Sequence, residues 1–308
     1  MAMVAAEQEM VTVRRRVPWW RLLWRDKFAL VSALWLALLL VCFAIGPALL
    51  ADDAVRVNLA ARNAPPGLDS GWINLLGADA LGRPLLARLV LGTRNTLAIA
   101  FSVVLVALCV GGLLGMVAGY LGGVTNALIM RFADVLSSFP SLLLALIVLY
   151  VLGPQVVNLI IVLATTRTAI YLRVTRAEVL EIRERVFVDA ARALGAGRAH
   201  ILRRHIAPVV APTLGTIMTI DFASVMLSES ALSFLGIGIQ PPEVTWGLMV
   251  SQGRNYLGSA WWLAFFPGLA IMLTALSANL LSSWLRTITD PTQRWRLEAP
   301  RTLAEGGR

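Results

Sequence analysis

The chain has 308 residues, of which 58% are hydrophobic and 15% are charged, and its mean hydropathy is +0.74. Soluble domains average roughly 45–50% apolar and about 25% charged residues. The apolar excess, which falls in long uncharged runs, excludes a soluble globular enzyme. It predicts an all-α, polytopic membrane protein.

The charged residues exclude most familiar enzyme chemistry. Lys27 is the single lysine among 27 basic residues, and it stands between an Asp and a Phe, so the chain has no P-loop for a nucleotide. His200 and His205 are five residues apart, which rules out a His-Glu-x-x-His zinc helix. Cys42 and Cys109 lie inside apolar runs and behave as small hydrophobic residues. We therefore expect a protein that is not an enzyme and binds no cofactor or metal.

Six apolar runs predict six transmembrane helices. Their ranges are 28–50, 96–118, 138–152, 156–172, 213–235 and 261–285. The first run follows a basic stretch, which is also the pattern of a cleaved signal peptide. A signal h-region is only about 7–15 residues long, so an uncleaved signal-anchor is favoured. Gly153 and Pro154 predict a turn after the third helix, and Arg167 interrupts the fourth.

The distribution of basic residues predicts the orientation. With the N-terminus in the cytoplasm, 21 basic residues lie inside and six outside, so both termini are expected to be cytoplasmic. The pI of about 10.8 is then a topology signal, and we expect no nucleic-acid partner. The N-terminal segment 1–27 mixes arginines with tryptophans and suits an anionic lipid surface. The segment 287–308 forms a cytoplasmic tail.

Two local patterns predict packing within the membrane. Gly111, Gly115 and Gly119 form a small-xxx-small ridge that lets a second helix approach closely. Arg131 and Asp134 are three residues apart, and we expect them to pair at the start of the third helix.

Two loops are long enough to carry function. The extracytoplasmic loop 51–94 is rich in proline and acidic residues. The cytoplasmic loop 173–212 has helical character up to a glycine at 195, with Glu181 and Arg185 spaced to pair on one helix face. A charged, structured loop in a chain without its own nucleotide site could dock a partner, or it could simply be solvated.

The motifs of this cytoplasmic loop are similar to those of a known family. Asp189-Ala190-Ala191-x-x-x-Gly195, followed by Ile206-x-Pro208, resembles the EAA loop of ABC-importer permeases, with Asp189 for the usual Glu and Ala207 for the usual Leu. Further segments resemble the C-type permeases of dipeptide, oligopeptide or nickel importers. They are Gly77 to Gly82 with Arg83, Arg88 and Arg94; Gly119 to Gly123; Phe139-Pro140-Ser141; Glu229 to Gly236; Trp261-Trp262; and Phe266-Pro267-Gly268. Pro84 and Trp284 depart from the family pattern.

The resemblance implies a type I importer permease with its core at 95–286. Segment 188–198 is then the coupling helix, with its motif completed by Ile206 and Pro208. The partners would be a B-type permease, two ATPase subunits that use ATP and Mg, an extracytoplasmic binding protein and membrane lipid. The expected activity is alternating-access import of di- or oligopeptides across the inner membrane of a bacterium. Nickel, haem or another small solute is the alternative cargo, and a channel or membrane enzyme acting alone is the competing class.

Three charged residues within predicted spans are candidates for the translocation path. Asp221, Glu229 and Arg167 are costly in lipid and should face the bundle or a wet cavity. Each also has an ordinary structural explanation: hydrogen bonding to a neighbouring helix or turn for the two acids, and an extended side chain at a helix end for Arg167.

Overall fold

The computed structural model describes residues 19–68 and 71–289. Most of the predicted basic segment 1–27 and of the tail 287–308 lies outside these residues. The described helices are α2 (Trp19–Arg25), α3 (Lys27–Val55), η1 (Leu59–Ala61), η2 (Trp72–Asn74), α4 (Leu85–Leu121), α5 (Gly123–Ser138), α6 (Ser141–Leu152), α7 (Val156–Ile182), α8 (Val186–Ala193), α9 (Arg198–Ile201), η3 (Leu202–Ile206), α10 (Ala207–Phe234), α11 (Trp246–Gly253), η4 (Arg254–Tyr256) and α12 (Trp262–Thr289).

Helices long and apolar enough to cross a membrane dominate the described chain. Five of them meet this standard, namely α3, α4, α7, the continuous segment Arg198–Phe234 and α12. The pair α5 and α6 makes a sixth crossing if its two bent halves are counted together. The all-α, polytopic prediction is confirmed, and the count is five or six.

The third predicted span, 138–152, corresponds to α6, and the chain is broken just before that helix. Helix α5 ends at Ser138, α6 begins at Ser141, and the two axes differ by 83°. Pro140 explains the break, because proline pushes the residue before it out of the helical region, and Phe139 is extended (φ −96°, ψ 137°). The expected pairing of Arg131 with Asp134 is wrong. Asp134 binds Arg173 of α7 instead, at 3.1 Å.

The loop predicted at 173–212 is shorter than expected, because the helices on both sides extend into it. Helix α7 continues to Ile182, and α10 starts at Ala207. The extension of α7 carries several charged side chains, yet its inner face remains buried through Thr175, Val179 and Ile182. The apolar run that predicted this span ends at residue 172, ten residues before α7 ends.

Helix α4 lies at the centre of the bundle and packs against α3, α7 and α10. Its glycine ridge faces α7 closely. A Cβ added at Gly111 would lie 2.6 Å from the Thr168 carbonyl oxygen, and one added at Gly115 would lie 2.6 Å from the Leu172 carbonyl oxygen. Since no side chain fits in that space, the predicted packing role of the ridge is confirmed.

A small second core joins the two ends of the described chain. Leu22 of α2, Ala29 of α3 and Trp284 of α12 are buried together. The turn between α2 and α3 is fixed by Asp26, whose carboxylate accepts hydrogen bonds from the Phe28 and Ala29 amides at 3.1 Å each. Trp284, the residue that departs from the family pattern, thus holds the first described helix against the last.

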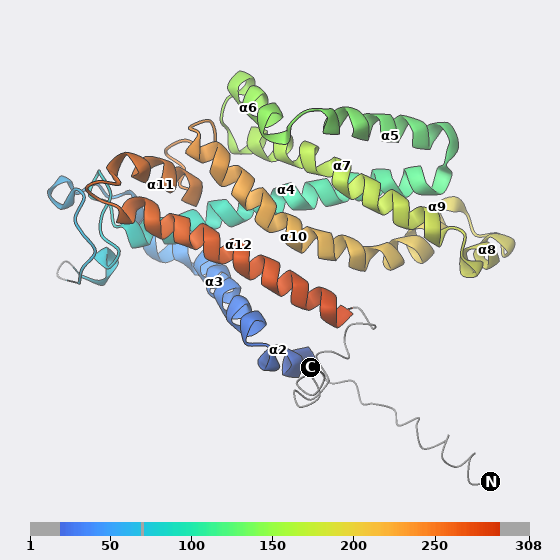
Figure 1. Ribbon diagram of the computed structural model, residues 1–308, viewed down its shortest axis with the longest axis horizontal. Helices are drawn as coiled ribbons and strands as arrows, with labels where there is room; N and C mark the ends of the chain where they lie inside the picture. The colour runs from blue at the N-terminus through green and yellow to red at the C-terminus, as the bar shows by residue number, and fades with distance from the viewer. Residues whose placement is uncertain (1–18, 69–70, 290–308) are drawn as a thin grey trace, which may run out of the picture.

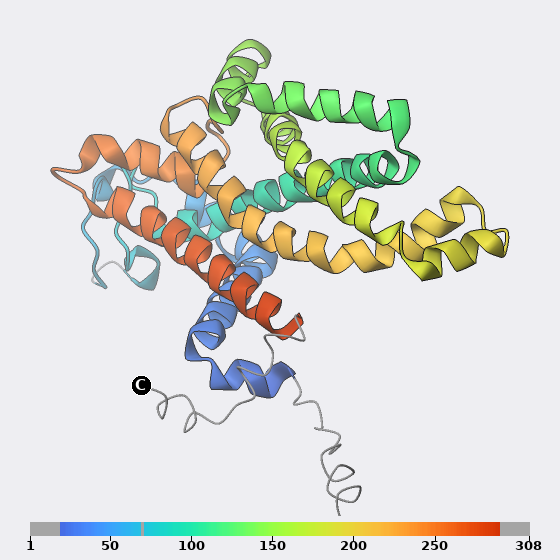
Figure 2. The same ribbon diagram turned by 45° about the vertical axis from the view of Figure 1, so that its right-hand side comes forward.

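The molecule has two opposite ends with different structures. Helices α8 and α9 form one end, and α11 with the loops preceding α4 forms the other (Figure 1). The turned view in Figure 2 shows the same separation, with α4, α7 and α10 running between the ends and the α5–α6 pair lying along one flank.

Candidate coupling site and charged groups within the bundle

The predicted coupling segment forms the tip of one end of the molecule (Figures 1 and 2). Val188 and Ala191 point inward from α8 and join the main core together with Ile206. Asp189 and Ala190 are exposed on the same helix. The motif thus combines residues that attach the tip to the bundle with residues available to a partner.

Gly195 follows α8 in a left-handed conformation. Its φ is +83°, and an added Cβ would meet no atom within 4 Å. The glycine is needed for its backbone angle, because the surrounding space would accept a side chain. Its amide donates to the Arg192 carbonyl at 2.9 Å and closes the turn.

An ion pair and a cation–π contact orient the exposed side of α8. Asp189 and Arg192 are 3.0 Å apart, and the Arg192 guanidinium lies 5.6 Å from the centroid of the Tyr120 ring. Tyr120 belongs to the end of α4, so the tip contacts a helix that runs through the bundle. Pro208 is exposed directly after the π-helical turn η3, and it has no amide hydrogen to donate back to that turn.

Exposed apolar side chains at the tip were not singled out from the sequence. Val186 is 84% exposed, Leu194 is 88% exposed and Phe187 is 40% exposed. Exposed apolar side chains that gather in one place mark binding surfaces. A signal was present in the sequence, because all three flank the Asp-Ala-Ala motif within a polar loop.

Two of the three charged candidates within the spans form a pair. Arg167 of α7 lies 3.1 Å from Asp221 of α10, and its second terminal nitrogen donates to the Ser228 hydroxyl at 3.1 Å. Both acceptors belong to α10. Arg167 therefore turns inward to α10 instead of extending toward a helix end, and the Asp221 charge is compensated within the bundle.

Glu229 lies apart from this pair and is completely buried. Its carboxyl oxygens accept hydrogen bonds from the hydroxyls of Ser233, at 2.8 Å, and Ser230, at 3.3 Å. These two hydroxyls belong to its own helix and not to a neighbouring one. The three residues are thus two separate features and not one cluster.

Comparison with known proteins identifies the class of protein. The profile of the family described as binding-protein-dependent transport system inner membrane component matches residues 111–295. The chain belongs to this family. It is accordingly a multi-pass permease subunit of the inner membrane, a transporter component rather than an enzyme.

Two relatives resemble almost the whole chain. A probable D,D-dipeptide transport system permease protein of Escherichia coli is 36% identical over 88% of this chain and 91% of its own length. A di/tripeptide transport system permease protein of Pseudomonas aeruginosa is 37% identical over 88% of this chain and 90% of its own.

A solved structure shares the fold. A chain of the MetNI methionine ABC transporter, in an inward-facing conformation, aligns with a TM-score of 0.54 at 19% identity. The alignment covers 67% of this chain and 99% of that one. The helical arrangement is thus that of an ABC-importer permease.

Proposed function

We propose that the chain is the C-type permease of an ATP-driven importer that moves di- or oligopeptides into the cytoplasm by alternating access. It pairs with a B-type permease, and the two enclose the path. An extracytoplasmic binding protein delivers the cargo, and both termini face the cytoplasm. The relatives are named as dipeptide and di/tripeptide permeases, which supports a peptide cargo over nickel, haem or another small solute.

The coupling tip is the observation that carries this proposal. Helix α8 and its C-terminal cap expose Val186 and Leu194 to solvent, while Val188 packs the helix against the core. A surface of this kind needs a partner, and an ATPase subunit supplies one. Two ATPases bind ATP and Mg and hydrolyse the nucleotide, and this chain binds no cofactor. Residues 188–198 transmit the ATPase movement to α7 and α10.

The test replaces one exposed apolar side chain at the tip. Leu194→Asp removes apolar contact area without touching the buried face of α8, so it should weaken ATPase binding by at least about tenfold. The matched control is Leu59→Asp, at a leucine that is also exposed and lies at the other end of the molecule. Recovery of ATPase subunits with the tagged chain, and uptake of a labelled dipeptide by membrane vesicles, are measured for both variants.

Two outcomes would contradict different parts of the proposal. Leu194→Asp with normal ATPase recovery and normal uptake would remove the tip from the coupling machinery. A wild-type chain that purifies from its native membrane without any ATPase would reject the importer altogether and favour a channel or an enzyme acting alone.

A further inference from the structure

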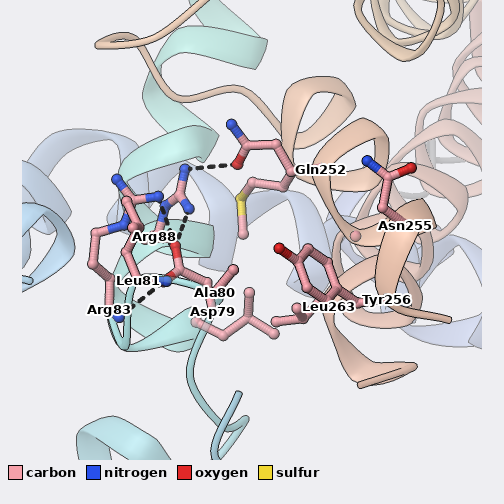
Figure 3. Close-up of a pocket in the computed structure, with 12 residues that line it drawn as sticks. Asp79, Ala80, Leu81, Arg83, Arg88, Gln252, Asn255, Tyr256 and Leu263 are labelled. Atoms are coloured by element: carbon pink, nitrogen blue, oxygen red, sulfur yellow. Dashed lines mark hydrogen bonds and ion pairs between the residues drawn. The ribbon is translucent and has the colours of Figure 1, made fainter. Parts of the chain in front are cut away.

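A charged pocket lies at the end of the molecule opposite the coupling tip. It has a volume of about 290 Å³ and lies between the loop preceding α4, the first turn of α4, and the α11–η4–α12 segment (Figure 3). Its polar lining consists of Asp79, Arg83, Arg88, Gln252, Asn255 and Tyr256. The proposed function uses none of these residues.

The single carboxylate of this pocket, that of Asp79, accepts hydrogen bonds on both of its oxygens. One oxygen of Asp79 accepts the backbone amides of Leu81 and Arg83, at 2.9 Å each. The other accepts two nitrogens of the Arg83 guanidinium, at 2.7 Å each, and one nitrogen of Arg88. Burial raises the pKa of Asp79, but these hydrogen bonds and the two positive charges outweigh it, so its pKa lies below the ordinary value. Asp79 is ionised at neutral pH.

The two arginines, by contrast, have too few acceptors. Each guanidinium carries five N–H donors and a full positive charge, and the pocket contributes one negative charge against two positive charges. Arg88 is 3% exposed, and its Nε has no hydrogen-bond partner. Its remaining contact is to the Gln252 amide oxygen at 3.3 Å, which brings no charge. A buried cation without a full counter-charge is costly, so the pocket is incomplete without another acceptor.

We propose that this pocket receives an acidic side chain of the extracytoplasmic binding protein when that protein docks. The inference rests on the proposed function, and the description of the family as binding-protein-dependent supports it. Charge complementarity selects the partner group, because a carboxylate supplies the missing negative charge and accepts two parallel N–H bonds from a guanidinium. The surrounding loops expose Leu81, Leu257 and Trp261, by 42%, 57% and 52%. Buried arginines flanked by apolar and aromatic side chains are typical of the residues that dominate protein interfaces.

Two substitutions test the proposal by opposite routes. Arg83→Gln removes the surplus positive charge while Asp79 keeps its bond to Arg88. Gln252→Glu instead supplies an internal carboxylate next to Arg88, which completes the pocket and strengthens its internal bonding. The matched control is Arg62→Gln, which removes a charge from an exposed arginine of the same loop outside the pocket.

The measurement is the dissociation constant between the complete permease–ATPase complex in lipid nanodiscs and its own binding protein, loaded with substrate. Both pocket variants should weaken binding by about tenfold, the value of one charge-assisted hydrogen bond. Arg62→Gln should change it by less than about twofold, as expected for a rim charge. Co-elution of all subunits confirms that each complex is intact.

Each alternative result overturns the proposal in a recognisable way. If the arginines only hold the loop together, Gln252→Glu will bind as well as wild type. If the pocket instead recognises the carboxylate of the cargo, docking will be normal and the KM for peptide uptake will rise in both variants. If the wild-type complex binds no binding protein, the proposed function fails together with this inference.

Discussion

Charged side chains within the membrane-spanning part of this chain are compensated in two different ways. Arg167 and Asp221 neutralise each other between α7 and α10, with side chains that are 20% and 8% exposed. Glu229 is buried among hydroxyl groups. A charge within a bilayer is tolerated when it pairs inside a bundle, and the Arg167–Asp221 pair meets that requirement between two helices that lead to the coupling tip.

Replacing Asp221 with Asn should destabilise the complex, because it leaves the Arg167 guanidinium without its counter-charge. We expect a loss of up to about 3 kcal/mol, since breaking a buried pair costs more than the pair is worth. The double variant Arg167→Leu/Asp221→Leu should recover most of this loss. Thermal unfolding of the detergent-solubilised complex measures both.

The exposed pair of Arg173 and Asp134 provides the control. Its side chains are 42% and 56% exposed, so Asp134→Asn should cost less than about 1 kcal/mol. Equal losses for the two Asp→Asn variants would mean that the Arg167–Asp221 pair contributes no more than a surface contact.

Among the helices, α4 and α7 form the tightest contact because the glycine ridge places their backbones directly against each other. An added Cβ at Gly115 would lie 2.6 Å from both the Leu172 carbonyl oxygen and the Thr175 Cβ. Gly112 lies three residues earlier in the same helix. A Cβ added there would lie 3.4 Å from the flexible end of the Leu214 side chain. Two glycines in one helix are therefore under very different constraints.

Gly115→Ala should separate α4 from α7 and destabilise the chain by about 1–3 kcal/mol, the usual cost of overpacking. Gly112→Ala makes the same chemical change where the space allows it, and should be neutral or slightly stabilising because alanine favours the helix. The yield of monodisperse complex and its thermal midpoint are compared for the two variants. Similar behaviour of both would show that the ridge is not a close contact.

The sequence predicted those parts of the structure that depend on residues close together in the chain. The glycine ridge has a fixed spacing, and the apolar runs have the length of a bilayer. Partners from distant segments could not be predicted in the same way. Asp134 lies three residues from Arg131 in the sequence but pairs with Arg173, and Arg88 contacts Gln252 only because α11 folds back over α4. Helix ends were also misplaced where a buried face continues beneath charged residues, as in α7 up to Ile182.

In the candidate site, too, local patterns could be read from the sequence and contacts between distant residues could not. The motif at 189–195 could be located from the sequence because its glycine and small residues have fixed positions in a short segment, and its coupling role stays a prediction. The ion pair of Arg167 with Asp221 joins residues 54 positions apart, so its members were noted separately and not as a pair. In the sequence Trp284 is only a departure from the family pattern. The structure explains this tryptophan, because Leu22 packs against it.

At the scale of the whole molecule, the coupling tip and the outer pocket are connected by uninterrupted helices. Helix α4 carries Arg88 in its first turn and Tyr120 near its last. Since both ends are built on the same rigid elements, we expect the chain to move as one body during transport, with its rearrangement confined to contacts with other subunits.

Spin labels at the two ends test this expectation. Ala199→Cys, at an exposed position of α9, and Leu59→Cys are introduced after Cys42 and Cys109 have been replaced by alanine, and the distance between the labels is measured by pulsed electron resonance in the complete transporter. The distribution should be the same with and without ATP. A second distance that appears on nucleotide addition would show that the chain bends internally.

The break between α5 and α6 determines which flank of the molecule lipid can touch. The twelve residues of α6 rise roughly 18 Å, less than the roughly 30 Å of a hydrocarbon layer. The kink at Phe139 interrupts the ladder of main-chain bonds, and acyl chains offer nothing in exchange. We therefore expect that side to be wetted or covered by another polypeptide, and lipid to contact the side formed by α3. A single copy extracted into detergent would then leave main-chain polar groups at the break without partners, so co-expression with the proposed companion permease should give a better-behaved sample.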